Sequence, residues 1–264
     1  MQFKEKEIYG FEDLVAIMEL LRAPGGCPWD REQTHKTIRN NLIEETYEAI
    51  EAIDTDDAAL LREELGDVLL QVVFHSRISE EAGDFNVGDV IDEVCKKLIV
   101  RHPHVFADVI AEDSEAVLKN WDEIKKSRKN QTTQKQVMDS ISTSLPALIR
   151  ADKIGKKAAK VGFDFANALD ALKKVVEETE EVESAIKENN NEHIKEEIGD
   201  LLFAVVNLAR KAGIDSEEAL YGANNKFISR FGKVETLAAQ RGIEMKAENI
   251  EKLDKIWEEI KTDC

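Results

Sequence analysis

A repeated acidic pattern constrains the fold of this chain more than any other feature of its sequence. LIEETYEAIEAI at 42–53 matches VVEETEEVESAI at 175–186, and LREELGDVLLQVVFHSR at 61–77 matches IKEEIGDLLFAVVNLAR at 194–210. Two shorter pairs follow in the same order: KKLIVR at 96–101 with NKFISR at 225–230, and WDEIK at 121–125 with WEEIK at 257–261. Matching blocks in one order indicate that a single unit has been duplicated within the chain.

The repeated unit has the hydrophobic period of α-helices. Apolar residues in 194–210 recur at three- and four-residue steps, namely Ile194, Ile198, Leu201, Leu202, Val205 and Leu208. Turn signals such as EAGDFN at 81–86 and KENNNEH at 187–193 separate the helices. No segment shows the strict apolar–polar alternation of a strand. We therefore expect an all-α protein with a bundle of helices in each of two tandem units.

The boundary between the two copies is expected in a polar stretch. Residues 126–144 are weakly periodic and nearly free of aromatic side chains, which is typical of a linker. The first unit would then span 1–125 and the second 145–264. Ser144 could cap the first helix of the second unit. Pro146 is compatible with this start, because proline is tolerated in the first turn of a helix.

Composition limits the partners and the compartment of the chain. The formal net charge is −18, from 36 basic and 54 acidic residues, which disfavours binding to nucleic acid or to an anionic membrane. Apolar runs are far shorter than the roughly 20 residues of a membrane span, and the first residues do not resemble a secretory signal. The three cysteines lie far apart, so a reducing cytoplasm is expected.

Pairs of carboxylates recur in both copies at helical spacing, and residues three apart share one face of a helix. The pairs are Glu45 with Glu48 and Glu64 with Asp67 in the first copy, and Glu178 with Glu181 and Glu197 with Asp200 in the second. If the two helices of each copy pack antiparallel, four carboxylates converge, and their repulsion would cost several kcal/mol unless a cation separates them. Oxygen ligands without histidine or cysteine suit Mg²⁺ or Mn²⁺. The alternative is that these acids only cover a solvated face.

The residues beside these acids predict that the acidic helices lie in the core. Leu65, Val68 and Leu69 surround the first set, and Ile198, Leu201 and Leu202 surround the second. Gly66 and Gly199 occupy the same position in both copies. Glycine within a helix costs about 1 kcal/mol relative to alanine, so this recurrence predicts close packing or room for a ligand.

Basic and aromatic residues offer a possible binding surface for a polyanion. Lys97 with Arg101 and Lys226 with Arg230 recur at helical spacing, and Trp121 with Lys125 parallels Trp257 with Lys261. The second copy adds a basic helical stripe that the first copy mostly lacks, made of Arg150, Lys153, Lys156 and Lys157. It also has Asn207 and Asn224 where the first copy has Phe74 and Cys95. The second unit is therefore expected to be the main active unit.

The EExxE…EExGD pattern in a helical unit resembles the MazG nucleoside triphosphate pyrophosphohydrolases. GCPWDREQTH at 26–35, RHPHVF at 101–106, SLPALIRADKIGKKAAKVGFDF at 144–165 and the closing WEEIK are also similar to that family. The resemblance covers nearly the whole chain. It implies Mg²⁺-dependent cleavage of nucleoside triphosphates to the monophosphate and pyrophosphate, a house-cleaning role towards unwanted nucleotides, and a homodimer.

The resemblance also implies roles for individual residues. Metal ligands would be Glu178, Glu181, Glu197 and Asp200, with Glu45, Glu48, Glu64 and Asp67 as their counterparts in the first copy. Glu177 or Glu178 would act in catalysis, with Glu177 or Glu44 orienting or deprotonating the attacking water. Substrate contacts would come from Lys226, Arg230, Lys261, Trp257, Asn224, Lys153, Lys156 and Phe163.

Two alternatives stay open at this point. The chain could be a non-catalytic helical regulator that binds metal and nucleotides, or a phosphohydrolase that releases orthophosphate. Pyrophosphate release from a panel of nucleotides separates these possibilities.

Overall fold

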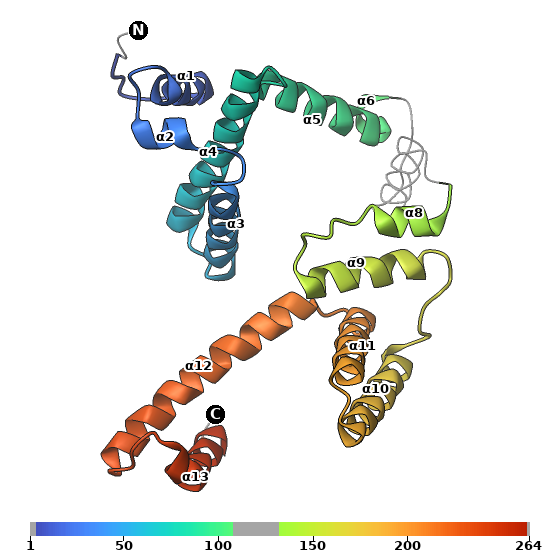
Figure 1. Ribbon diagram of the computed structural model, residues 1–264. Helices are drawn as coiled ribbons and strands as arrows, with labels where there is room; N and C mark the ends of the chain where they lie inside the picture. Colours follow the sequence, from blue (N-terminus) through green and yellow to red (C-terminus); the bar gives the residue numbers. More distant parts are fainter. Residues whose placement is uncertain (1–3, 108–131, 263–264) are drawn as a thin grey trace. The chain divides into compact units, whose positions relative to one another are not determined.

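A computed structural model describes residues 4–107 and 132–262 of the chain (Figure 1). Every regular element within these ranges is a helix, which confirms the all-α prediction. The chain divides into two compact units, Met1–Ile124 and Lys125–Cys264. None of the described helices is long and apolar enough to cross a membrane.

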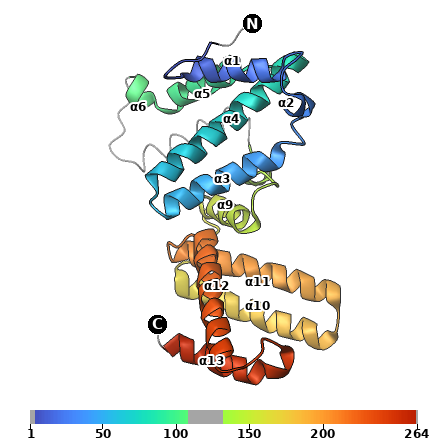
Figure 2. The same cartoon turned by 90° about the vertical axis from the view of Figure 1, so that its left-hand side faces the viewer.

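The first unit is built around a long helical hairpin. Its helices are α1 (Phe11–Arg22), α2 (Pro28–Glu32), α3 (Arg39–Asp54), α4 (Ala58–Ala82), α5 (Val87–Arg101) and α6 (Pro103–Phe106). Asp57 starts α4 by accepting hydrogen bonds from the backbone N–H groups of Ala59 and Leu60, each at 3.0 Å. Gly83 ends α4 with a φ of 78°, in the left-handed region that favours glycine. Both ribbon views show α3 lying along α4 (Figures 1 and 2).

The core of the first unit joins α1 and α4. Met18, Ile38, Val73 and Phe74 form its fully buried cluster. The guanidinium of Arg22 stands 5.4 Å from the centre of the Phe74 ring. The apolar centre of this unit is thus filled by its own side chains.

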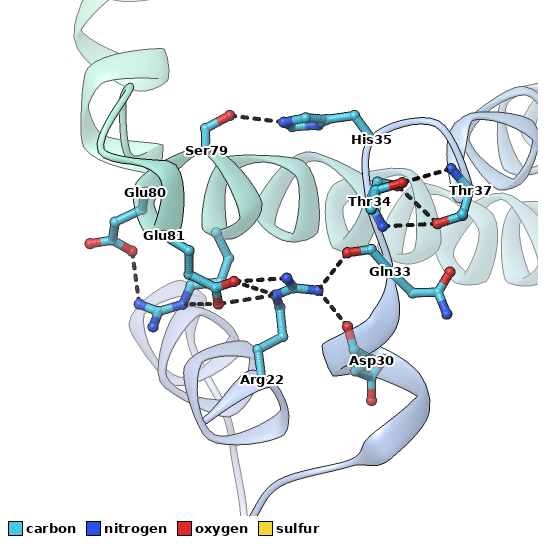
Figure 3. A network of polar contacts seen from close by, with 10 residues as sticks. Arg22, Asp30, Gln33, Thr34, His35, Thr37, Ser79, Glu80 and Glu81 are labelled. Carbon is cyan, nitrogen blue, oxygen red and sulfur yellow. Dashed lines mark hydrogen bonds and ion pairs between the residues drawn. The ribbon is translucent and has the colours of Figure 1, made fainter. Parts of the chain in front are cut away.

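A polar network fixes the segment that follows α1 (Figure 3). Arg22 donates to the carboxylate of Glu81 at 2.7 Å and to the carbonyl oxygens of Asp30 and Gln33. His35, farther along the same segment, lies 3.2 Å from the hydroxyl of Ser79 on α4. Since the Arg22 side chain contacts α4, the Asp30 carbonyl of α2 and the Gln33 carbonyl after it, the network holds the 26–35 segment against the hairpin.

The second unit contains a second helical hairpin and a long helix that extends from it. Its elements are α8 (Gln134–Asp139), α9 (Ala147–Ala159), α10 (Ala168–Glu188), α11 (Asn191–Lys211), α12 (Ser216–Gln240), η1 (Ala247–Asn249) and α13 (Ile250–Thr262). Helix α10 ends at Asn189, whose φ of 53° reverses the chain, and Asn190 caps α11. Helices α10 and α11 lie side by side, and α13 packs on α12 (Figures 1 and 2).

Small residues allow the close approach of α10 and α11, whereas larger ones join α12 to α13. Ala171 and Ala185 of α10 and Ala204 of α11 are buried. The α12–α13 contact is a cluster of Val234, Ala238, Ile256 and Ile260. Among the described residues, large apolar side chains of both helices, such as Val176 and Leu202, stay exposed.

The stretch expected to be a linker, 126–144, contains structure in its described part. Residues 134–139 form α8, which packs on α9 and buries Val137. The helix starts because the Thr133 hydroxyl accepts from the backbone N–H of Gln136 at 3.2 Å, in a capping box. The expected cap at Ser144 is wrong, since α9 has no side-chain cap at its N-terminus. Trp121, Lys125 and residues 126–131 lie outside the described residues.

Candidate active site

The hairpin of the second unit brings carboxylates of two helices together. Oxygens of Glu178 on α10 and of Glu197 and Asp200 on α11 lie within 4.8 Å of one another. Glu178 is only 5% exposed. The antiparallel arrangement and the convergence inferred from the spacing are thus observed for these three acids.

The state of Glu178 tests whether this group fits a cation. Its Oε2 atom is buried and has no hydrogen-bond partner in the part of the chain that the structure describes. A buried carboxylate oxygen without a partner is unfavourable, and a divalent cation would satisfy it. Glu181 shares a hydrogen bond with Glu178, and this contact, together with burial, raises the pKa of Glu181. The residues present therefore fit a divalent metal ion.

Lys174 lies one turn before Glu178 and contacts the predicted catalytic acids. Its Nζ atom is 2.5 Å from Glu178 Oε1 and 2.9 Å from Glu177 Oε1. These contacts, the one with Glu178 first, raise the pKa of Lys174, so its charge is secured. The sequence analysis did not identify Lys174, although its spacing of four from Glu178 was a usable signal. The first copy has Asn41 at this position.

His193 is a second neighbour of the group that was not identified from the sequence. Its Nε2 atom lies 3.0 Å from Glu197, and its Nδ1 atom lies 2.9 Å from Glu188. The hydrogen bond to Glu188 and the nearby charge of Glu197 raise the pKa of His193. The imidazole thus orients one of the predicted metal ligands.

The first unit holds a similar carboxylate group on α3 and α4. Oxygens of Glu45, Glu48 and Glu64 lie within 4.8 Å of one another, whereas Asp67 stands outside this tight set. Burial and then the charge of Asp67 raise the pKa of Glu45, and burial and then the charge of Glu48 raise that of Glu64. Close acids whose mutual repulsion is not relieved would also fit a cation.

Most of the apolar residues beside both groups do not lie in a core, which corrects the prediction. Leu65 and Leu202 are each 53% exposed, Leu69 and Ile198 are exposed as well, and Val68 and Leu201 are half-buried. The reason is that the described elements leave these faces of the hairpins largely uncovered. A Cβ atom at Gly66 or Gly199 would meet nothing within 4 Å. These glycines were predicted to allow either close packing or room for a ligand. The structure shows open space at both positions and no close packing.

The predicted substrate contacts on α12 and α13 form a group apart from the carboxylates. Trp257 packs on Phe227, with ring centres 5.2 Å apart, and borders the α12–α13 cluster. Lys261 pairs with Glu258 at 2.7 Å. Asn224 and Lys226 are exposed, and Arg230 is half-buried. Within the ranges that the structure describes, no ion pair or hydrogen bond joins these five side chains to the acids of α10 and α11.

The basic stripe on α9 is only partly available for binding. Lys153 is exposed, whereas Lys156 pairs with Asp152 at 2.7 Å. Arg150 places its Nε atom in a buried position without a partner among the described residues. Phe163, in the loop after α9, is 81% exposed.

Comparisons with known proteins match both halves of the chain to one family. The sequence profile of the MazG nucleotide pyrophosphohydrolase domain matches residues 33–106 and 167–234. The nucleoside triphosphate pyrophosphohydrolase of Escherichia coli (strain K12) is 46% identical over 94% of this chain and 95% of its own length. The nucleoside triphosphate pyrophosphohydrolase/pyrophosphatase MazG of Thermotoga maritima is 45% identical, with 95% of each chain covered. The uncharacterized protein YabN of Bacillus subtilis is 47% identical over 98% of this chain but only 53% of its own length. Each matched segment contains one of the carboxylate groups.

Proposed function

The chain belongs to the MazG nucleotide pyrophosphohydrolase family, and we propose that its second unit hydrolyses nucleoside triphosphates to the monophosphate and pyrophosphate. The observation that supports this most directly is the buried carboxylate of Glu178, which lies next to Glu197 and Asp200. Its Oε2 atom has no hydrogen-bond partner among the described residues. Such a group suits phosphate chemistry, because the acids can hold a divalent cation and the cation attracts phosphate oxygens.

The proposed metal is Mg²⁺, with Mn²⁺ as a possible substitute, held by Glu178, Glu181, Glu197 and Asp200. A bound divalent ion would neutralise phosphate charge and make a bound water more acidic. Glu177 is exposed at the edge of the group and accepts the attacking water's proton in this scheme. Lys174 pairs with Glu177 and Glu178 and adds positive charge where phosphate oxygens would approach. The attack is in line, on the α or β phosphorus.

The remaining phosphate contacts are proposed to come from α12 and α13 of a second copy. Lys226, Arg230 and Lys261, with Trp257 and Asn224, lie away from the acids in the second unit. Helix α12 exposes a series of large apolar side chains: Leu220, Tyr221, Phe227, Ile228 and Phe231. Exposed apolar surface of this extent favours association, and a homodimer would cover it. The proposed role is the removal of unwanted nucleotides from the cytoplasmic pool, without nucleic acid or membrane as partners.

The test replaces one ligand and one matched acid on the same helix. Glu178→Gln should abolish pyrophosphate release from a nucleoside triphosphate panel with Mg²⁺, while circular dichroism shows unchanged helicity. Glu183→Gln removes an exposed acid of α10 that pairs only with Lys187 in the described chain, and it should keep full activity. Wild-type turnover by Glu178→Gln would disprove the assignment.

A further inference from the structure

A cavity in the second unit lies beside the carboxylate group and has no role in the proposal so far. It has a volume of about 650 Å³ and lies between α8, α9, α10 and α11. Its lining is mainly apolar and includes Phe163, Phe165 and Phe203, with Lys174, Asn207 and Arg210 as polar members. Small-molecule sites are typically clefts of about 300–1,000 Å³ with a few polar groups. The cavity has the size and the lining of such a site.

Lys174 connects this cavity with the carboxylates. The same side chain lines the cavity and lies 2.5 Å from Glu178 Oε1. A ligand in the cavity that carries a phosphate chain could therefore direct that chain past Lys174 towards the acids. We propose that the cavity binds the heterocyclic base of the nucleotide whose phosphates are held at Glu178, Glu197 and Asp200. This inference rests on the proposed function and adds the substrate's recognition element to it.

The polar groups of the cavity are mostly committed to one another. The Asn207 side chain donates to the carbonyl of Phe203 at 3.1 Å and accepts from Arg210 at 3.0 Å. Arg210 also pairs with Asp164. With these groups paired, the cavity offers aromatic and apolar surface rather than a set of free donors and acceptors. Stacking on aromatic side chains tolerates every base, so we expect purine and pyrimidine nucleotides to bind with similar affinity.

The first copy has larger residues at two positions that line the cavity of the second unit. Gly155 allows α9 to approach α11 so closely that a Cβ atom there would lie 2.7 Å from Asn207 Oδ1. The first copy has Leu21 and Phe74 at the positions of Gly155 and Asn207, and both pack in the core cluster with Met18 and Ile38. A much smaller cavity of about 80 Å³ lies between α1 and α4 in that unit. Two positions that pack in the core of the first copy thus line the cavity of the second.

The experiment compares Phe203→Ala with Val205→Ala in the full-length chain. Val205 is an exposed neighbour on the same helix and does not line the cavity. With ATP, GTP and UTP as substrates, Phe203→Ala should raise KM about tenfold and leave kcat nearly unchanged, whereas Val205→Ala should behave as wild type. A second variant, Ala158→Trp, fills the cavity from α9 and should raise KM to a similar extent.

A direct binding measurement separates this inference from the proposed function. Binding of AMP, followed by equilibrium dialysis, needs no hydrolysis and should weaken in Phe203→Ala and Ala158→Trp, while Mn²⁺ binding stays unchanged. Unchanged KM and unchanged AMP binding in both folded variants would overturn the base pocket and leave the hydrolase assignment intact. Conversely, cavity-dependent AMP binding by a chain that hydrolyses no triphosphate would support the pocket and disprove the hydrolase.

Discussion

The two units share their acids and differ in what surrounds them. Glu45, Glu48 and Glu64 in the first unit and Glu178, Glu197 and Asp200 in the second form groups of the same size. One turn before the first acid, however, the first unit has Asn41 and the second has Lys174. A cation-binding group needs only two helices packed antiparallel. A substrate site needs further residues around it, and Lys174 beside Glu178 is a candidate for one in the second unit.

The same contrast appears in the packing behind the acids. The first unit fills its interior with Phe74 and places Arg22 over the ring. The second unit has the polar Asn207 at the equivalent position and Arg210 in contact with it. The second unit also has Gly155 where the first has a leucine, and both Gly155 and Asn207 line its cavity. Two positions that pack in a core in the first unit thus line a cavity in the second.

The largest expected effect separates the two carboxylate groups. Glu197→Gln in the second unit should lower kcat at least about 1,000-fold, because the metal contributes several kcal/mol to stabilising the reacting phosphate. Glu64→Gln, the equivalent change in the first unit, should leave at least half of the turnover, since that unit has Asn41 at the position of Lys174. Steady-state pyrophosphate release measures both.

Metal titration sharpens the same comparison. If both units hold metal, each variant should lose one of two Mn²⁺ sites per chain, seen by equilibrium dialysis. Equal losses of turnover in Glu64→Gln and Glu197→Gln would contradict the division between a metal-binding unit and a catalytic unit.

The sequence was sufficient to predict the helical repeat and the acidic groups because both depend on short-range geometry. Residues three apart share a helix face, and the Asn189–Asn190 reversal makes α10 and α11 antiparallel. What covers a face is not a short-range property. Leu65 and Leu202 match a core pattern, yet each is half exposed because no element in the described part of the chain covers them.

The cavity could not be predicted for a related reason. The sequence shows Asn207 in place of Phe74, but the structural consequence of this difference depends on the distance between α9 and α11. That distance is set by Gly155, which lies 52 positions away in the chain (155 to 207). Lys174 is a simpler omission, because its spacing from Glu178 follows the same rule that identified the acids.

A smaller effect tests the close approach of α9 and α11. Gly155→Ala should lower the free energy of unfolding by about 1–3 kcal/mol, because the new Cβ atom overlaps Asn207 and Arg210. Gly222→Ala is the matched control, since a Cβ atom there meets nothing within 4 Å. That change should raise the free energy of unfolding by up to about 1 kcal/mol, as expected for alanine within a helix. Urea unfolding followed by circular dichroism measures both, and a stabilised Gly155→Ala protein would show that the helices are not in tight contact.

The smallest expected effect concerns the ion pair that holds the loop after α9 to α11. Arg210, and then Lys211, lower the pKa of Asp164 from its ordinary value of 3.8 to about 2. A depressed carboxyl pKa stabilises the folded state above the unfolded pKa and loses this contribution as the pH falls through the folded pKa. Asp164→Asn should therefore lower the free energy of unfolding by roughly 1–2 kcal/mol at pH 7, and the difference from wild type should shrink between about pH 4 and pH 2.

The counterpart in the first unit makes this test a comparison. Arg22 likewise lowers the pKa of Glu81, and its side chain also donates to the backbone carbonyls of Asp30 and Gln33. Glu81→Gln should thus destabilise the first unit with the same sign of pH dependence, while the surface variant Asp139→Asn, which loses an exposed pair with Lys135, changes stability by less than about 1 kcal/mol. A pH-independent loss in Asp164→Asn would mean that packing of the 160–165 loop, and not its charge, keeps Arg210 beside Asn207. Packing, and not the Asp164–Arg210 ion pair, would then hold Arg210 in its place in the cavity wall.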